Sequence, residues 1–262
     1  MRTANSTFRE LVPGAKRRDR WLSGLSAKHR GRYQFSRLPP EIRTVLPHCV
    51  IGHNSKVVFI KNSKAACTTV AHLMYRHDNG SDYSGNIHHA KDIESPFAWP
   101  TLMDRLKHGY LFSVVRNPEA RAVSGFFDFF VTARNREAAK HHPYAGKFGI
   151  LKHDALTNRF DAFLDYVGAA LDADPLETDR HFRPQHLNLG HDHIELSYVA
   201  RVEQLENDLR EIGVQTGMNL LDEQDPKPRR RNVSGSDAFQ ITAQQRAKIE
   251  AMFAKDYEIY GY

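Results

Sequence analysis

Residues 110–126, YLFSVVRNPEARAVSGF, run from an apolar segment through a polar turn into an amphipathic segment. The first six residues are rich in apolar and β-branched types, which favours a strand buried in a parallel sheet. Pro118 suits the first turn of a helix because its fixed φ fits and its missing N–H is not needed there. Beyond it, Val123, Phe126 and Phe130 recur at helical spacing. The stretch therefore predicts strand, turn and helix, one unit of an α/β fold.

Residues 56–69, KVVFIKNSKAACTT, show the same order nearer the N-terminus. A β-branched run predicts a strand, a turn follows, and helical spacing continues as far as His77. Two such units predict an α/β domain with a central, mainly parallel sheet flanked by helices. The other predicted elements are a strand at 197–200, helices at 160–171 and 202–212, and a last helix at 242–257 opened by a capping box.

The N-terminal part differs from the rest of the chain in charge. Residues 1–43 hold eleven lysines and arginines against three acidic residues, so they carry +8, the whole chain +6 and the remainder −2. They lack sustained periodicity, and Pro39-Pro40 interrupts them. We therefore predict a basic, partly extended lead-in over residues 1–47 and a single domain over residues 48–262. Such an arm is either a solvated tail or a contact for a polyanionic acceptor or a membrane surface.

Composition disfavours several classes of protein. The sequence has no zinc-finger spacing and no aromatic RNA-binding signature, which argues against a nucleic-acid partner. Only Cys49 and Cys67 occur, so we expect a reducing compartment rather than a disulfide framework. No apolar run reaches the roughly 18 residues of a membrane span, and the N-terminus lacks the apolar core of a signal peptide. A soluble, cytoplasmic protein is expected.

The run Lys64-Ala65-Ala66-Cys67-Thr68-Thr69 follows the first predicted strand and opens a helix. A helix start binds phosphate because it presents unpaired N–H groups and the positive end of the dipole. Lys64 can neutralise an anion there, and small residues let the backbone approach it. A Walker A loop is disfavoured because no glycine lies between Asn54 and His77. A surface lysine on an ordinary turn is one alternative, and Lys61 is a competing lysine.

Arg116 and Ser124 indicate a second phosphate-binding segment. Arg116 ends the predicted strand, and its guanidinium offers a rigid fork of donors that matches a phosphate. Ser124 lies two helical turns further on and can add a hydroxyl at the same anion. Arg121 leaves two interpretations open, a part in this site or an ion pair on the helix surface.

Both segments resemble the motifs with which sulfotransferases bind 3′-phosphoadenosine-5′-phosphosulfate (PAPS). Residues 59–69 are similar to the 5′-phosphosulfate loop, with Ser63 where the family has proline. Residues 116–126 are similar to the 3′-phosphate segment, R-[NDH]-P-x-x-R-x-x-S-x-[YF]. The two stand in the family's order, each after a predicted strand. The resemblance implies a three-layer, P-loop-like fold.

Three later segments are similar to the carbohydrate sulfotransferases, the sulfotransferase-2 group: residues 181–187 (HFRPQHL), 198–209 and 256–262. Residues 130–175 match poorly. Golgi members carry a membrane anchor and a cysteine pair after the R-P-Q segment, where residues 188–191 read NLGH. The resemblance thus implies a soluble, bacterial-type enzyme. It would transfer the sulfuryl group of PAPS to a carbohydrate hydroxyl and release 3′,5′-ADP, without a metal.

The resemblance also implies roles for single residues. Lys64 would neutralise the bridging oxygen as 3′,5′-ADP leaves, and Arg116 and Ser124 would clamp the 3′-phosphate. The segment before the last helix would close over the nucleotide, with Arg231 as a ligand. The 5′-phosphate would be bound by the remaining residues of the loop, Ala65, Ala66, Cys67, Thr68 and Thr69.

The acceptor hydroxyl needs a general base. In related enzymes this is a His or Glu between or near the two motifs, which favours His88 and His89. His186 and Glu94 are alternatives, and another is that the histidines merely pack or face solvent.

The roles of a basic run and of two histidine clusters remain open, as do three competing functions. The run 229–231 (RRR) is either solvated or contacts PAPS or an anionic glycan, with Asn232 and Ser234 beside it. The clusters at 141–142 and 191–193 contain histidine without cysteine or a helical i, i+4 pair, which disfavours a metal site. The competing functions are sulfation of a lipid or small-molecule hydroxyl, a nucleotide kinase-like activity, and non-catalytic binding of a glycan or nucleotide.

Overall fold

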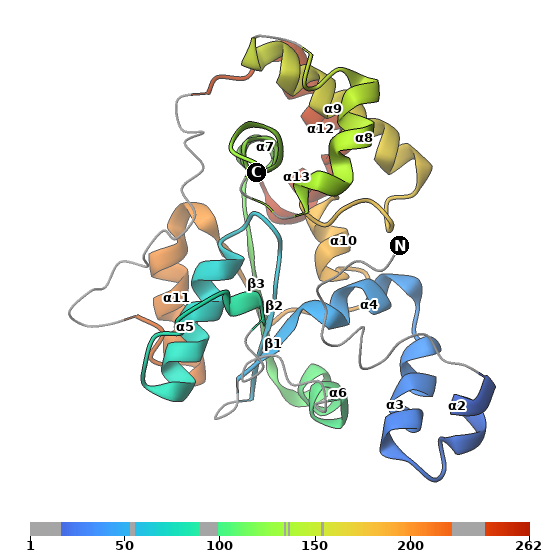
Figure 1. Cartoon of the computed structure of the whole chain (residues 1–262). Coiled ribbons are helices and arrows are strands. Elements are labelled where there is room, and N and C mark those ends of the chain that lie inside the picture. The colour runs from blue at the N-terminus through green and yellow to red at the C-terminus, as the bar shows by residue number, and fades with distance from the viewer. Residues whose placement is uncertain are drawn as a thin grey trace. The chain divides into compact units, whose positions relative to one another are not determined.

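The computed structural model describes residues 17–52, 56–89, 99–133, 135, 137–152, 155–221 and 239–262 (Figure 1). The chain divides into two compact units. The first, the sheet unit, comprises Met1–Asn62, Ala66–Val114 and Leu189–Arg229. The second, the helical unit, comprises Ser63–Ala65, Val115–Asn188 and Arg230–Tyr262.

One sheet has the strand order β1-β2-β3-β4, formed by β1 (Cys49–Ile51), β2 (Val57–Ile60), β3 (Tyr110–Val115) and β4 (Tyr198–Arg201). Strands β2 and β3 are parallel, since α5 (Cys67–Asn79) and α6 (Trp99–His108) supply the long connection that a parallel pair needs. Strands β1 and β2 are antiparallel because residues 52–56 alone connect them, too few for a crossover. The prediction of a mainly parallel sheet is therefore corrected at its first strand.

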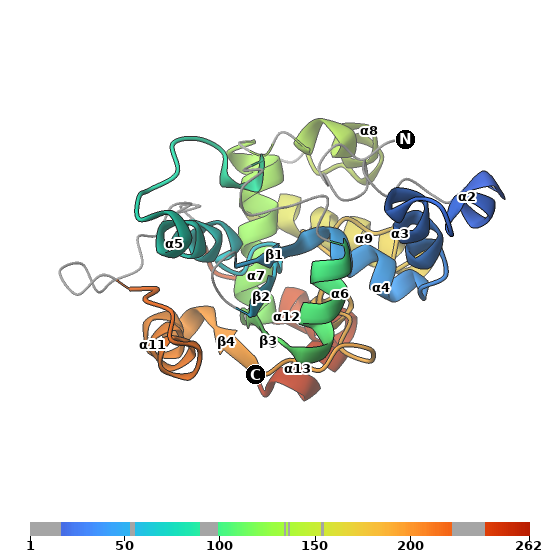
Figure 2. The same cartoon turned by 90° about the horizontal axis from the view of Figure 1, so that it is seen from below.

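The sheet unit buries an apolar core between the sheet and two helices. Phe59 of β2 stacks on Phe112 of β3 with ring centroids 5.1 Å apart, and both belong to a cluster with apolar residues of α5 and α11 (Leu205–Thr216). Figures 1 and 2 show α5 and α11 side by side on one side of the strands and α6 on the other. Because helices cover both faces, all four residues of β2 are buried. The predicted sheet flanked by helices is confirmed.

The helical unit has a separate, aromatic core. Phe126 contacts Phe160 and Phe163 at centroid distances of 5.3 and 5.6 Å. The prediction that a helix begins at Pro118 is confirmed, and Asn117 caps it by accepting the Ala120 N–H. The predicted capping box is also present before the last helices. The elements are α7 (Pro118–Phe126), the π-helix η3 (Phe127–Val131), α8 (Ala138–Phe148), α9 (Leu156–Ala173), α10 (Gln185–Leu189), α12 (Ala243–Met252) and α13 (Ala254–Tyr260).

The N-terminal region differs from expectation. Residues 17–45 were expected to be partly extended, but they form α2 (Arg17–Leu22), α3 (Ala27–Ser36) and α4 (Pro40–Val45), followed by the 3-10 turn η1 (Leu46–His48). Proline fits here because Pro40 occupies the first turn of α4, where no N–H is needed. Residues 1–16 lie outside the described residues. A lead-in followed by a single domain stays a prediction.

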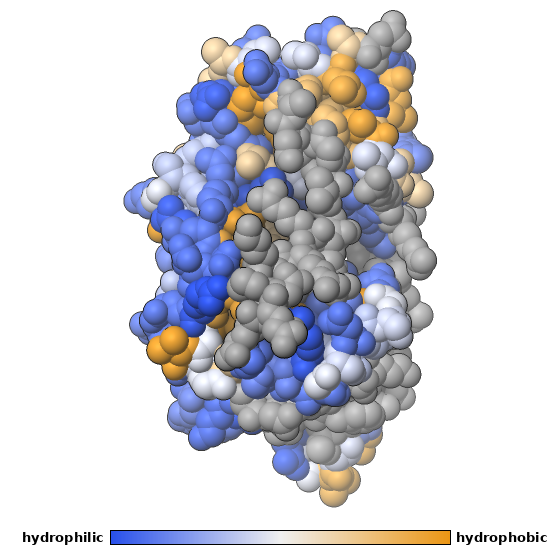
Figure 3. All heavy atoms as spheres, turned by 90° about the vertical axis from the view of Figure 1, so that its left-hand side faces the viewer, coloured by the Kyte–Doolittle hydropathy of each residue, from blue (hydrophilic) through white to orange (hydrophobic). Residues whose placement is uncertain are grey.

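The remaining predicted elements are present in the described part of the chain. The helix expected at 202–212 is a 3-10 turn, η4 (Val202–Gln204), followed by α11. No helix among the described residues is long and apolar enough to cross a membrane. On the face that Figure 3 shows, most of the coloured residues are hydrophilic, and the apolar ones lie in separate patches.

Candidate active site

The loop after β2 is tied to β3 by buried polar side chains. Asn62 is fully buried and donates from Nδ2 to the carbonyl of Val114 at 3.0 Å. Ser113, also fully buried, donates from Oγ to the carbonyl of Ile60 at 2.7 Å. These bonds satisfy polar groups that burial would otherwise penalise. They also fix the point at which the predicted phosphosulfate loop leaves the sheet.

The loop after β2 takes left-handed backbone conformations without glycine. Lys64 has φ 68° and Ala66 has φ 54°, both in the left-handed region that favours glycine. Non-glycine residues held there store strain that is found mainly at functional sites. Ala66 is the N-cap of α5 and offers no side-chain acceptor to the first N–H groups of the helix. Such a turn, leading into an uncapped helix start, is suited to bind an anion.

Within the sheet unit, one of the two predicted bases contacts a threonine that is predicted to bind the 5′-phosphate. His88 belongs to the short turn η2 (Ile87–His89), and its Nε2 is 3.0 Å from Oγ1 of Thr68. Its backbone N–H donates to Oδ1 of Asn86 at 3.1 Å. The structure therefore brings His88 and Thr68 together. The side chain of His89 lies outside what the structure describes.

Within the helical unit, Lys64 forms an ion pair with a residue that the sequence analysis does not single out. Its Nζ is 3.0 Å from Oδ2 of Asp128, and the two side chains are 12% and 23% exposed. Ala65 beside it is fully buried. Asp128 lies in η3, directly after the 3′-phosphate segment, and only its position next to that segment could have indicated it.

Arg121 holds the loop rather than making an ion pair on the helix surface. It is 2% exposed, so the surface interpretation is wrong. Its Nε donates to the carbonyl of Ser63 at 3.0 Å, and its Nη2 donates to the carbonyl of Arg180 at 2.9 Å. The second predicted segment thus fixes the backbone next to Lys64.

Arg116 is held through its main chain by the R-P-Q segment. The side chain of Gln185 accepts the Arg116 N–H at 3.0 Å and donates to the Arg116 carbonyl at 2.8 Å. Asp256, fully buried, in turn accepts the N–H groups of Gln185 and His186 at 2.7 and 2.9 Å. Ser124, the other predicted ligand of the 3′-phosphate, is 4% exposed on α7. Two segments distant in sequence therefore position the strand end that carries Arg116.

Of the alternative bases and the basic run, the structure describes only His186. Nδ1 of His186 is 2.8 Å from Oδ1 of Asp256, so the ring of this histidine is held by the same carboxylate that accepts its backbone N–H. Glu94 lies outside the described residues. So do the residues of the basic loop, Arg229, Arg230, Arg231, Asn232 and Ser234.

Lys61, the competing lysine, is buried. Burial lowers its pKa to about 8, while the thiols of Cys67 and Cys49 act in the opposite direction. Burial also raises the pKa of the Cys49 thiol to about 12. A lysine in this environment resists carrying its charge, which does not suit the neutralisation of a dianion.

We expect Lys61→Met to stabilise the protein at pH 7 by about 1–3 kcal/mol. The folded pKa of about 8 lies below the unfolded value of 10.5, so the unfolded state binds more protons between these values. Wild-type stability should therefore rise with pH across that window, and the advantage of the variant should shrink. Urea unfolding of both proteins at pH 7 and pH 10 measures this. A variant less stable than wild type at both pH values would contradict it.

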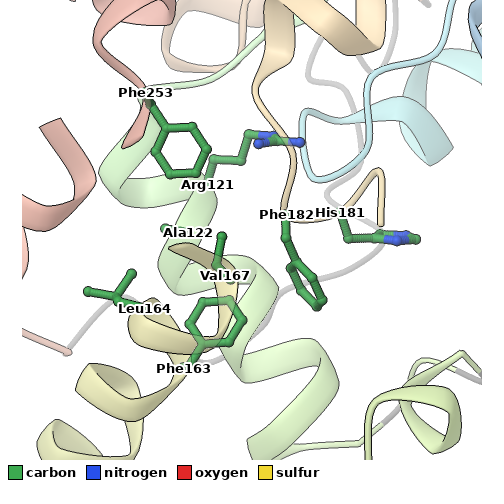
Figure 4. A pocket seen from close by; sticks show the side chains of 8 residues that line it. All are labelled: Arg121, Ala122, Phe163, Leu164, Val167, His181, Phe182 and Phe253. Carbon is green, nitrogen blue, oxygen red and sulfur yellow. The ribbon is translucent and has the colours of Figure 1, made fainter. Parts of the chain in front are cut away.

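The helical unit also contains a small pocket. It is lined by Arg121, Ala122, Phe163, Leu164, Val167, His181, Phe182 and Phe253. Figure 4 shows the polar ends of Arg121 and His181 pointing away from the apolar side chains. The pocket contains none of the residues predicted to bind the donor. Its apolar lining is not suited to a phosphate.

The histidine clusters form no metal site in the described part of the chain. No three His, Cys, Asp or Glu side chains gather there in a way that could hold a metal. His141 instead makes hydrogen bonds, with Asp179 at 3.0 Å and with the hydroxyl of Tyr166 at 2.7 Å.

Comparison with known proteins agrees with both motifs. A family model described as "Sulfotransferase family" matches residues 47–262, most of the chain. No curated protein and no solved structure matches the chain significantly. The matched range contains the glycine-free loop, the segment that begins at Arg116 and the R-P-Q segment.

Proposed function

The chain belongs to the sulfotransferase family, and we propose that it transfers the sulfuryl group of PAPS to a carbohydrate hydroxyl and releases 3′,5′-ADP. The observation that carries the proposal is the family match over residues 47–262, which contains both phosphate motifs in order. A three-layer, P-loop-like arrangement is part of the proposal. Members of this family generally use PAPS as the sulfuryl donor.

We assign the donor groups as follows. Arg116 and Ser124 bind the 3′-phosphate, with Arg231 as a further ligand. Lys64 binds the bridging oxygen between phosphate and sulfuryl group. The left-handed turn and the uncapped start of α5 support an anion at the loop. The residues proposed to bind the 5′-phosphate are Ala65, Ala66, Cys67, Thr68 and Thr69.

Sulfuryl transfer resembles phosphoryl transfer, an in-line displacement through a loose transition state. The acceptor oxygen forms a bond to sulfur while the bond from sulfur to the bridging oxygen breaks. Negative charge then collects on the bridging oxygen, where the ammonium of Lys64 stabilises it. Catalysis of this kind depends on positioning and charge more than on covalent chemistry.

The carbohydrate acceptor is supported by the resemblance of residues 181–187, 198–209 and 256–262 to the carbohydrate sulfotransferases, and two of these segments contact each other and the donor side of the site. Asp256, from the C-terminal segment, accepts N–H groups of the R-P-Q segment, and Gln185 of that segment holds the main chain of Arg116. These segments therefore support the donor residues in this chain. A lipid or small-molecule hydroxyl is the alternative acceptor.

The proposed base is His88, with His89 as the second candidate. His88→Ala is expected to lower kcat by about 100-fold, because a positioned base contributes roughly 10²–10⁴-fold. Binding of 3′,5′-ADP should change by no more than a few-fold, since His88 contacts Thr68 but is itself assigned no contact with the donor. His142→Ala, an exposed histidine of α8, is the matched control. If His88→Ala and His89→Ala both keep near-wild-type kcat, neither residue is the base.

The donor half is tested by calorimetric binding of 3′,5′-ADP, 5′-AMP and ATP without magnesium. Tight binding that requires the 3′-phosphate is expected, and equal binding of all three would overturn the proposal. The acceptor half is tested by transfer of labelled sulfate from PAPS to a panel of glycans, glycolipids and phenols. Label in the glycans supports a carbohydrate acceptor, and label only in the others refutes it.

A further inference from the structure

The helix formed by α7 and η3 holds the loop at two places. Arg121 donates to the carbonyl of Ser63, and two turns later Asp128 pairs with Nζ of Lys64 at 3.0 Å. Both side chains of the ion pair are mostly buried, and breaking such a pair from one side leaves an uncompensated charge. Asp128 lies in the π-helix η3. Such π-helical turns are rare in proteins, and where they occur they are often at functional sites.

Asp128 is itself held by an amide of fixed orientation. Nδ2 of Asn135 donates to Oδ2 of Asp128 at 3.2 Å. Oδ1 of Asn135 accepts the N–H of Glu137 at 2.9 Å, so the amide nitrogen must face Asp128. The second hydrogen of that nitrogen points to Nε2 of His181 at 3.5 Å. The amide therefore links the carboxylate to a histidine.

The histidine is fixed in turn by a carboxylate. Because the ionised carboxylate of Asp179 can only accept hydrogen bonds, Nδ1 of His181 carries a proton. Nδ1 donates to Oδ1 of Asp179 at 2.7 Å. Burial alone would raise the pKa of Asp179, but His181 and hydrogen bonds from both His141 and His181 hold it well below its usual value. Asp179 is therefore ionised at neutral pH and anchors the series of side-chain contacts that leads through His181 and Asn135 to Asp128.

We propose that Asp128 is the positioning residue for Lys64, whose ammonium group it holds in place until the donor arrives. The proposal rests on the proposed function, since it assigns Lys64 to the bridging oxygen. In this proposal Asp128 acts through Lys64 and touches no reacting atom itself. A carboxylate at this place also repels an anionic ligand. Asp128 should therefore favour turnover and oppose ground-state binding, two effects of opposite sign.

The test is Asp128→Asn, which keeps the shape and removes the charge. We expect kcat with PAPS to fall at least about tenfold, while the Kd of 3′,5′-ADP is unchanged or tightens by up to about tenfold. Asn135→Ala should shift both quantities in the same directions, by less. Asp165→Asn, which removes a surface partner of Lys248, is the matched control. A purely structural role would weaken binding and turnover together, and that result would overturn the proposal, as would an unchanged kcat.

A second measurement does not depend on the proposed function. Acetylation of Lys64 by acetic anhydride, followed by mass spectrometry, should be several-fold faster in Asp128→Asn than in wild type, because the amine loses its ion pair. Lys248, which keeps its own carboxylates in that variant, should react at an unchanged rate. Equal labelling of Lys64 in both proteins would show that the pair does not form, and would overturn the inference. If wild type binds no 3′,5′-ADP, the proposed function fails and the positioning role falls with it, whereas labelling still reports on the pair.

Discussion

Arg116→Ala is expected to weaken binding of 3′,5′-ADP by about 30-fold or more and to leave binding of 5′-AMP nearly unchanged. A guanidinium binds a phosphate through two parallel charged hydrogen bonds, and truncating one partner of such a pair costs about 2–5 kcal/mol. The effect should depend on the 3′-phosphate, because that is the group assigned to Arg116. Isothermal titration calorimetry with the two nucleotides measures the difference directly.

The expected loss should be local, because the main chain of Arg116 is held independently of its side chain. The side chain of Gln185 bonds both its N–H and its carbonyl. The melting temperature of Arg116→Ala should therefore stay close to that of wild type. Arg210→Ala, on the exposed face of α11, is the control and should bind both nucleotides normally. Equal weakening of 3′,5′-ADP and 5′-AMP would mean that Arg116 does not bind the 3′-phosphate.

Lys64→Met is expected to lower kcat by about 100- to 1000-fold, the loss seen when one donor to a developing negative charge is removed. The fall should exceed the change in affinity for 3′,5′-ADP, because the charge on the bridging oxygen develops fully only in the transition state. Single-turnover transfer from PAPS, to an acceptor identified in the panel, measures the rate.

Lys61→Met is the matched control for this variant. The two lysines stand three residues apart, but Lys61 is buried with a pKa lowered to about 8, whereas Lys64 pairs with Asp128. We expect Lys61→Met to keep turnover within a few-fold of wild type. If Lys61→Met loses turnover and Lys64→Met keeps it, Lys61 is the catalytic lysine and the assignment is wrong.

The local structure around both motifs was predictable because it depends on neighbouring residues. A β-branched run followed by helical spacing predicted β2 and α5, and Asn117 and Pro118 marked the start of α7. The lack of glycine in the loop disfavoured a Walker A site. It did not reveal that Lys64 and Ala66 take left-handed backbone conformations, since alanine and lysine have no preference for them.

Other features depend on residues far apart in the sequence. The antiparallel β1 was missed because a three-residue strand has too little pattern to recognise. The sequence left open whether Arg121 takes part in the phosphate site or forms an ion pair on the helix surface, and only packing shows that it is buried.

The sequence by itself determined the family, the order of the two phosphate motifs and most of the helices and strands. These follow from short-range periodicity and from residue types at fixed spacings. Only the tertiary structure decided which groups hold the motifs in place: Asp128 at Lys64, Arg121 at Ser63, and Gln185 at Arg116. The physical reason is that a buried charge or amide is stable only with a partner, and the chain supplies that partner from wherever folding places one.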